Sequence, residues 1–303
     1  MIFDKKPITI EQQICLLKQR GLQIDDEQKA YQYLSNISYY RLSAYWYTFL
    51  KEPKETHQFV TNATFDKVLN TYVFDRKLRI LVFDELERIE IALRTTLIYH
   101  YCLMFDNNWY EDKTLFKGKD SYFYKLQEIL LSEMDKTSEV FIKHYRKKYT
   151  KPANPPAWMA LELLSFGQLS MLFKNLKTNA ARKKVSDHFG VDEIVLESWL
   201  EALSYIRNVC AHHMRLWNRK LLKTPMIPKK PKGVWLEINP LPHQQNKIYL
   251  SLSIINYLLS FISPGNSFSR KIKTLLNAYP EIPLHYMGFT KDWQSEDLWK
   301  INE

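Results

Sequence analysis

The sequence predicts an all-α protein, and this fold class follows from three observations. Apolar residues recur at intervals of three and four over most of the chain, which is the spacing of one buried helix face. Only 7 of the 303 residues are glycine, so loops that need a left-handed backbone are scarce. No series of strands is indicated, because an alternation of apolar and polar residues is confined to 248–254.

Residues 1–60 are expected to form a small N-terminal helical subdomain. Thr9 and Gln12 have the spacing of a capping box and predict the start of its first helix, which Gly21 ends. Two further helices are expected at 26–34 and 39–46. The second is rich in aromatic residues, which suits core packing better than a base-stacking surface. The polar, proline-containing segment 51–63 separates this subdomain from the rest.

Residues 61–303 are expected to form the main helical domain. Its first segment, 64–104, contains neither proline nor glycine, which predicts one long helix or two in tandem. An apolar stripe marks its buried face and consists of Leu78, Leu81, Val82, Leu86, Ile89 and Leu93. On the charged face, Glu90 and Arg94 are four residues apart and can pair. Further helices are expected at 122–134, 139–148, 157–164, 167–176, 179–188, 192–213, 246–262 and 268–278, followed by a polar tail.

Charge and cysteine content indicate what the protein binds and in which compartment it occurs. The chain has 43 Lys and Arg against 33 Asp and Glu, and the resulting charge of +10 favours a polyanionic partner such as a nucleic acid. Glycine-rich phosphate-binding motifs are absent. The three cysteines, Cys15, Cys102 and Cys210, are too widely spaced for a disulfide framework, so a reducing compartment is expected. Without an apolar signal segment or a run long enough to cross a bilayer, a soluble cytoplasmic protein is predicted.

The segment from Arg207 to His212 carries the strongest candidate site. In a helix over 192–213, Asn208 lies ~100° and His212 ~140° from Arg207, so all share one broad face. His213 lies ~240° from Arg207 by the same geometry and is the poorer partner. Cys210 diverges from His212 by ~200°, which disfavours a Cys–His nucleophile.

These residue types suit the cutting of RNA without a metal ion. The ribose 2′-hydroxyl attacks the adjacent phosphorus and leaves a cyclic phosphate and a 5′-hydroxyl. Histidine moves protons near neutral pH, and arginine neutralises the phosphorane oxygens. We therefore assign His212 and Arg207 as catalytic and Asn208 as supporting. A second proton-transferring group is missing, which two copies of the helix in a symmetric dimer would supply.

The residues after this segment are basic. No Asp or Glu occurs from 202 to 236, and the residues expected to bind RNA are Arg215, Arg219, Lys220 and Lys223. The lysines at 229–232 could instead belong to a solvated loop that does not bind RNA. No second Cys or His pair has zinc-site spacing, so neither a metal nor another cofactor is expected. The simplest alternative for Arg207 and His212 is that they cap carbonyls at the end of the helix or pair with acidic residues.

Arg207-Asn208-x-x-x-His212 resembles the R-x4-6-H signature of HEPN ribonucleases. A longer series of segments, spread over about residues 5 to 220, resembles the abortive-infection (Abi-like, AbiD/AbiF) proteins of bacteria. These segments are Lys6-Pro7, Gln12-Gln13-Ile14, Arg20-Gly21-Leu22, Tyr39 to Trp46, Phe74-Asp75-Arg76-x-Leu78-Arg79, Glu87-x-x-Glu90, Ser165-Phe166-Gly167 and His212-His213-x-Arg215-Leu216-Trp217. The residues after 220 carry no matching segment.

The resemblance implies a helical HEPN-type bundle and a role in phage defence through RNA cleavage and growth arrest. It implies that Arg207 and His212 are catalytic, with Asn208 supporting them. Such ribonucleases usually build the site between two copies, which agrees with the missing second histidine and implies a homodimer. Some relatives are thought to be inhibited by a small non-coding RNA. The alternatives are a non-catalytic protein that binds a structured RNA, and a helical protein-interaction domain.

Overall fold

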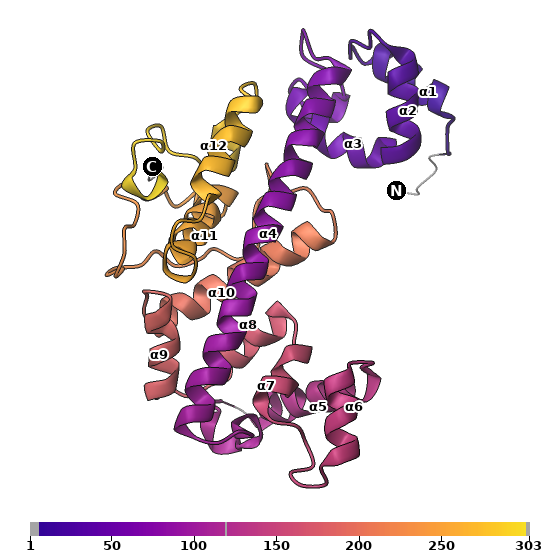
Figure 1. The fold of residues 1–303 in the computed structure, drawn as a ribbon. Helices are drawn as coiled ribbons and strands as arrows, with labels where there is room; N and C mark the ends of the chain where they lie inside the picture. Colours follow the sequence, from indigo (N-terminus) through magenta and orange to yellow (C-terminus); the bar gives the residue numbers. More distant parts are fainter. Residues whose placement is uncertain (1–5, 119, 301–303) are drawn as a thin grey trace. The chain divides into compact units, whose positions relative to one another are not determined.

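The computed structural model describes residues 6–118 and 120–300, and within these ranges the chain is all-helical (Figure 1). Strand pairing among the described residues is confined to isolated bridges, such as the one between Leu50 and Phe59. The predicted fold class is therefore confirmed. The chain divides into two compact units. Unit 1 comprises Met1–Leu78 and Leu275–Ile282, and unit 2 comprises Arg79–Thr274 and Pro283–Glu303.

Unit 1 is built from short helices. They are α1 (Ile10–Gln19), α2 (Glu27–Ile37), α3 (Tyr39–Trp46), η1 (Tyr47–Phe49) and η2 (Lys54–Thr56). The capping box of Thr9 and Gln12 forms as the spacing predicts. Tyr45 and Trp46 of α3 are buried, and the Tyr45 hydroxyl donates to the buried Asp75 carboxylate at 2.7 Å. This part of the aromatic segment packs in the core of unit 1.

Helix α4 (Phe65–Met104) is one continuous helix of 40 residues. The alternative of two tandem helices is therefore wrong, since no proline or glycine interrupts the sequence. The apolar stripe is buried as expected except at Leu81, which is half-buried. Val82, Leu86, Ile89 and Leu93 are fully inaccessible to solvent. The remaining elements are η3 (Trp109–Glu111), η4 (Lys113–Leu115), α5 (Asp120–Lys136), α6 (Val140–Lys148), α7 (Ala157–Ala160), η5 (Leu161–Leu163), α8 (Phe166–Asn175), α9 (Ala180–His188), α10 (Glu193–Ala211), α11 (Ile248–Ile262), α12 (Phe268–Ala278), η6 (Leu284–Met287) and η7 (Asp297–Trp299).

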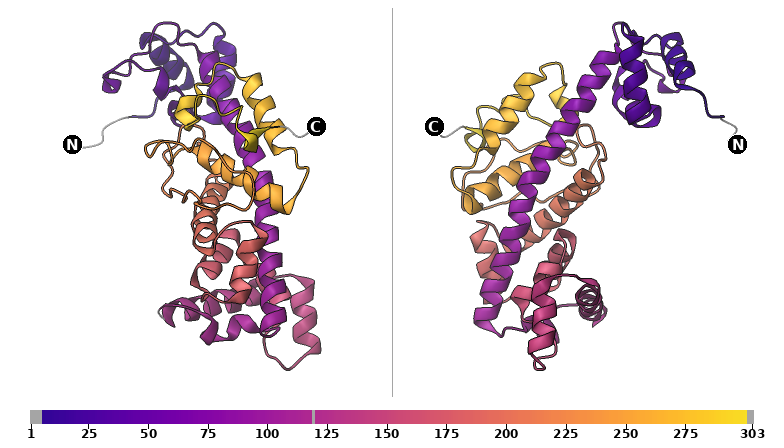
Figure 2. Two further views of the ribbon diagram at one scale, coloured as in Figure 1. Left: turned by 90° about the vertical axis from the view of Figure 1, so that its left-hand side faces the viewer. Right: turned by 45° about the vertical axis from the view of Figure 1, so that its right-hand side comes forward.

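Helix α10 is the centre of unit 2. It packs against α8, α9 and α11, and Figure 2 shows α8 and α10 side by side. Trp199, Leu203 and Ile206 form much of its fully buried face. Burial on several sides fixes the direction of α10, so its C-terminal end projects its side chains from a rigid support.

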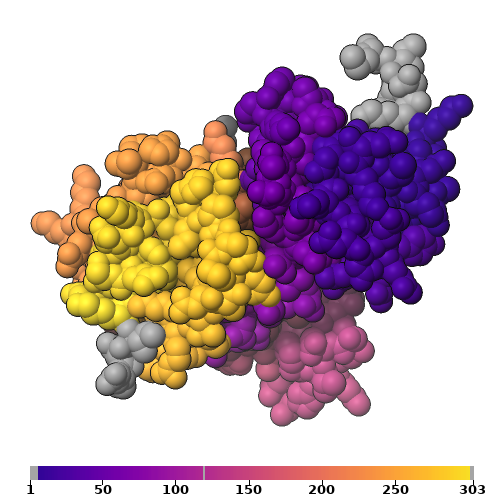
Figure 3. Space-filling view, turned by 90° about the horizontal axis from the view of Figure 1, so that it is seen from above, coloured from indigo at the N-terminus to yellow at the C-terminus, as the bar shows by residue number. Residues whose placement is uncertain are grey.

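The C-terminal region corrects one sequence prediction. The residues after α12 are not a polar tail, because Trp293 and Trp299 are buried and η7 packs against α11. The buried Glu296 carboxylate accepts the backbone N–H groups of Glu237 and Ile238 at 2.7 and 3.0 Å. In Figure 3 the surface of this region is coloured yellow. No helix among the described residues has the length and apolar character of a membrane span.

Candidate functional site

The C-terminal end of α10 carries the candidate site, and the helix ends earlier than the sequence predicts. It ends at Ala211, and His212 is its C-cap. His213 adopts a left-handed backbone with φ 55°. The N–H of Met214 donates to the Val209 carbonyl and that of His213 to the Cys210 carbonyl, both at 3.0 Å. This is the Schellman arrangement, in which a left-handed residue ends the helix. The predicted extension through His213 is therefore wrong.

Arg207 lies in the last turns of α10 and faces α4. Its Nη1 donates to the Asn208 Oδ1 at 3.3 Å, and its Nε lies 3.9 Å from the Glu90 Oε2. Its guanidinium lies 6.0 Å from the centre of the Phe83 ring. The side chain is 31% exposed, so it is held on one side and open to solvent on the other. An arginine in this position can reach a bound anion without leaving its partners.

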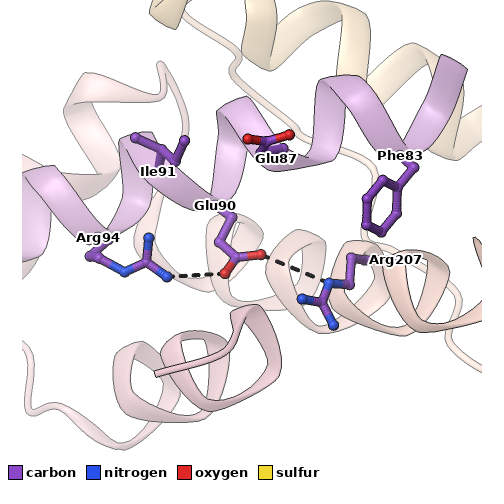
Figure 4. Close-up of a pocket in the computed structure, with 6 residues that line it drawn as sticks. All are labelled: Phe83, Glu87, Glu90, Ile91, Arg94 and Arg207. Carbon is purple, nitrogen blue, oxygen red and sulfur yellow. Dashed lines mark hydrogen bonds and ion pairs between the residues drawn. The ribbon is translucent and has the colours of Figure 1, made fainter. Parts of the chain in front are cut away.

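Glu90 of α4 joins Arg207 to Arg94 (Figure 4). Its Oε1 accepts a hydrogen bond from the Arg94 Nη2 at 3.0 Å, which confirms that the two residues pair along the helix. Arg94 is anchored further, because it donates to the carbonyls of Leu161 and Leu164 at 3.1 and 2.9 Å. The Glu90 carboxylate is thus fixed from one side and orients Arg207 on the other.

These residues border a surface pocket of about 330 Å³. Its lining consists of Phe83, Glu87, Glu90, Ile91, Arg94 and Arg207. Figure 4 shows that all of them except Arg207 come from α4. The charged face of the 64–104 segment gave a sequence signal for Glu87, Glu90 and Arg94, but nothing in the local sequence pairs them with α10. The pocket combines an aromatic ring, acidic groups and a guanidinium beside the end of α10.

His212 is exposed at the end of α10. Its backbone N–H donates to the Asn208 carbonyl at 3.0 Å, whereas no side-chain hydrogen bond of His212 is found within the described residues. Asn208 therefore connects both predicted catalytic residues, to Arg207 through its side chain and to His212 through its backbone. Within the described residues, no direct contact joins the side chains of Arg207 and His212. Cys210 is buried, which places its thiol out of reach of a substrate.

The basic residues after α10 differ in their surroundings. Arg219 donates to the Tyr205 hydroxyl of α10 at 3.0 Å and to the Arg215 carbonyl at 3.2 Å. Lys220 is exposed. Lys223 forms an ion pair with Glu201 and lowers the pKa of that carboxyl group. The charge of Lys223 is already balanced, so it contributes less to an anion-binding surface than its sequence position suggests.

No group of three or more His, Cys, Asp or Glu residues that could hold a metal ion occurs in the described part of the chain.

Comparison with known proteins gives a family match. The model of the family described as Abi-like protein matches residues 32–218, which is more than half of the chain. The matched range contains Glu90, Arg94, Arg207 and His212 and ends before the α11 region. Neither the curated proteins nor the solved structures give a match.

The pairing of Glu90 leads to a stability prediction. Arg94 is 11% exposed and donates hydrogen bonds to the Glu90 carboxylate and to two backbone carbonyls. Because Arg94→Met would leave these acceptors without a donor, it should lower the free energy of unfolding by about 3–5 kcal/mol. Arg207 is more exposed and its ion pair is longer, so Arg207→Met should cost less than about 1 kcal/mol. Urea denaturation followed by circular dichroism measures both. Equal losses would show that Arg94 does not anchor the pair.

Proposed function

This chain belongs to the Abi-like protein family, and from that premise we propose that it is a metal-independent endoribonuclease that acts in phage defence by abortive infection. The observation that carries the proposal is the placement of Arg207, Asn208 and His212 at the accessible end of a buried helix. Arg207 is oriented there by Glu90. An oriented guanidinium and an exposed imidazole on one rigid support suit phosphoryl-transfer chemistry.

The reaction begins when a ribose 2′-hydroxyl attacks the adjacent phosphorus. His212 takes the hydroxyl proton or donates one to the leaving 5′-oxygen, because imidazole exchanges protons near neutral pH. Arg207 stabilises the charge that develops on the phosphorane oxygens and remains protonated throughout. The products are a 2′,3′-cyclic phosphate and a 5′-hydroxyl.

Glu90 and Asn208 position Arg207 in this mechanism. Glu90 faces the Nε atom and Asn208 accepts from Nη1. The Nη2 group has no hydrogen bond within the described residues, so it is available to a phosphate oxygen. Because a carboxylate and an amide already position Arg207, its side chain loses less conformational entropy when it binds the transition state.

A homodimer would complete the site. A single His212 supplies one proton-transferring group, whereas cleavage uses a base and an acid. Ile80, Phe83 and Ile91 of α4 are exposed apolar residues, and the last two line the pocket beside Arg207. An exposed apolar face beside an incomplete site favours a second copy of this chain as its partner.

The alternative function is a non-catalytic protein that binds a structured RNA, such as a small regulatory RNA. The basic residues that follow α10 favour RNA as the partner in either case. In both cases we place the protein in the cytoplasm, where its RNA partner is found.

Substitutions at the end of α10 test the catalytic proposal. Arg207→Met and His212→Ala should each reduce cleavage of RNA by roughly 100-fold or more, since each removes a transition-state interaction. Far-ultraviolet circular dichroism should remain unchanged. His213→Asn is the matched control, because asparagine tolerates the left-handed backbone at this position, and it should retain activity. Cleavage that persists in His212→Ala would exclude this mechanism.

Substitutions on α4 test the dimer. Phe83→Lys combined with Ile91→Lys should shift the protein to a monomer in sedimentation velocity and reduce cleavage, because charges would oppose burial of this face. Val140→Lys on α6 replaces an apolar residue that is even more exposed, and it should change neither property. A wild-type protein that is monomeric and fully active would contradict the proposed composite site.

A further inference from the structure

Glu87 is an acidic residue beside the candidate site that the proposed mechanism does not use. Its neighbour Glu90, three residues later on α4, is occupied by Arg94 and Arg207. Glu87 is exposed, lines the same pocket, and takes part in no hydrogen bond or ion pair found within the described residues. Both oxygens of its carboxylate are therefore available as acceptors to a ligand in the pocket.

Phe83 gives the pocket an accessible aromatic ring. It lies four residues before Glu87 on α4, so the two side chains leave the same face of the helix one turn apart (Figure 4). Phe83 is 38% exposed, and the centre of its ring lies 6.0 Å from the Arg207 guanidinium. An exposed ring of this kind is a surface on which any nucleobase can stack.

The arrangement of these groups matches the parts of a nucleotide. A nucleotide whose phosphate meets Arg207 carries its base one ribose away, within reach of the neighbouring Phe83 ring. A base stacked on that ring would present its edge to the side chain one helical turn along, which is Glu87. The pocket of about 330 Å³ lies at the small end of the range for ligand sites, which suits a single base.

Guanine is the base that a carboxylate recognises best. Its Watson–Crick edge carries two adjacent donors, N1–H and the N2 amino group, which can donate to the two oxygens of one carboxylate. Adenine and cytosine present an amino group beside a ring-nitrogen acceptor, and uracil presents one N–H between two carbonyls. Because an acceptor that faces a carboxylate is repelled, Glu87 would favour guanine over the other three bases.

We propose that Phe83 and Glu87 form a binding site for a guanine base next to the phosphate at which Arg207 and His212 act. The inference rests on the proposed function, because the strand that carries this base is the RNA substrate. Phe83 stacks on the base whatever its identity, and Glu87 selects guanine. Ile91 also lines the pocket, so a second copy packed against Ile91 would border the bound base and shield it from water.

The test measures cleavage of RNA strands in which every 2′-hydroxyl except one is methylated, which restricts cutting to one phosphate. Each base in turn is placed on the 5′ side and on the 3′ side of that phosphate. At one of the two positions, wild-type protein should cut strands with guanine at a kcat/KM roughly tenfold above the other bases, as expected for one bidentate pair. Hypoxanthine, which lacks the N2 amino group, should lose most of this preference.

Variants separate stacking from base selection. Glu87→Gln should lower kcat/KM for guanine roughly tenfold, to the level of the other bases. Phe83→Leu keeps an apolar side chain but removes the ring, so it should lower kcat/KM for all four bases by roughly fivefold or more. Glu128→Gln on α5 removes another exposed carboxylate without a partner among the described residues and should leave every rate unchanged.

The outcomes distinguish this site from the proposed ribonuclease activity. Equal cleavage at all four bases, or a guanine preference that survives Glu87→Gln, would overturn the base site and leave the ribonuclease standing. An equal loss of cleavage at every base in Glu87→Gln would also overturn base selection, because it would assign Glu87 to the chemistry.

Binding decides the matter if wild-type protein cuts none of the strands. The affinity of the protein for fully methylated strands is then compared between guanine and the other bases. A guanine preference that depends on Glu87 would support the base site and overturn only the ribonuclease. Its absence would overturn both proposals.

Discussion

The Glu90 carboxylate holds the guanidinium groups of Arg94 and Arg207, and the candidate site depends on this contact. Arg94 is the fixed end, because it also satisfies the carbonyls of Leu161 and Leu164. Arg207 is the open end and remains 31% exposed. A partly buried carboxylate between two cations avoids the cost of an unpaired charge and also limits where Arg207 can point. Glu90 of α4 therefore orients the Arg207 side chain that α10 presents at the surface.

Local interactions made part of this architecture predictable. The capping box at Thr9 and the Glu90–Arg94 pair each join residues fewer than five apart. The continuity of α4 follows from the absence of proline and glycine in its sequence. The end of α10 was less predictable, because the left-handed position that ends it holds His213 in place of the usual glycine. The contact between Glu90 and Arg207 joins distant segments, so no local pattern in the sequence pairs these two residues.

The C-terminal region was the least predictable from the sequence. Its residues form short 3-10 turns, which leave no period for a pattern of apolar residues to follow. Trp293 and Trp299 are nevertheless buried, and Glu296 binds backbone N–H groups of the loop before α11. These contacts fix part of the loop before α11. The region is thus a structural support for α11 and the loop before it, although it lies outside the matched family range.

The central claim is that Arg207 and His212 cut RNA by attack of the 2′-hydroxyl, without a metal ion. The most direct measurement is the chemistry of the ends that purified wild-type protein leaves on RNA in excess EDTA. We predict 2′,3′-cyclic phosphate and 5′-hydroxyl ends, formed at the same rate with and without the chelator. Fragments with 3′-hydroxyl and 5′-phosphate ends, or cleavage that stops in EDTA, would contradict the claim.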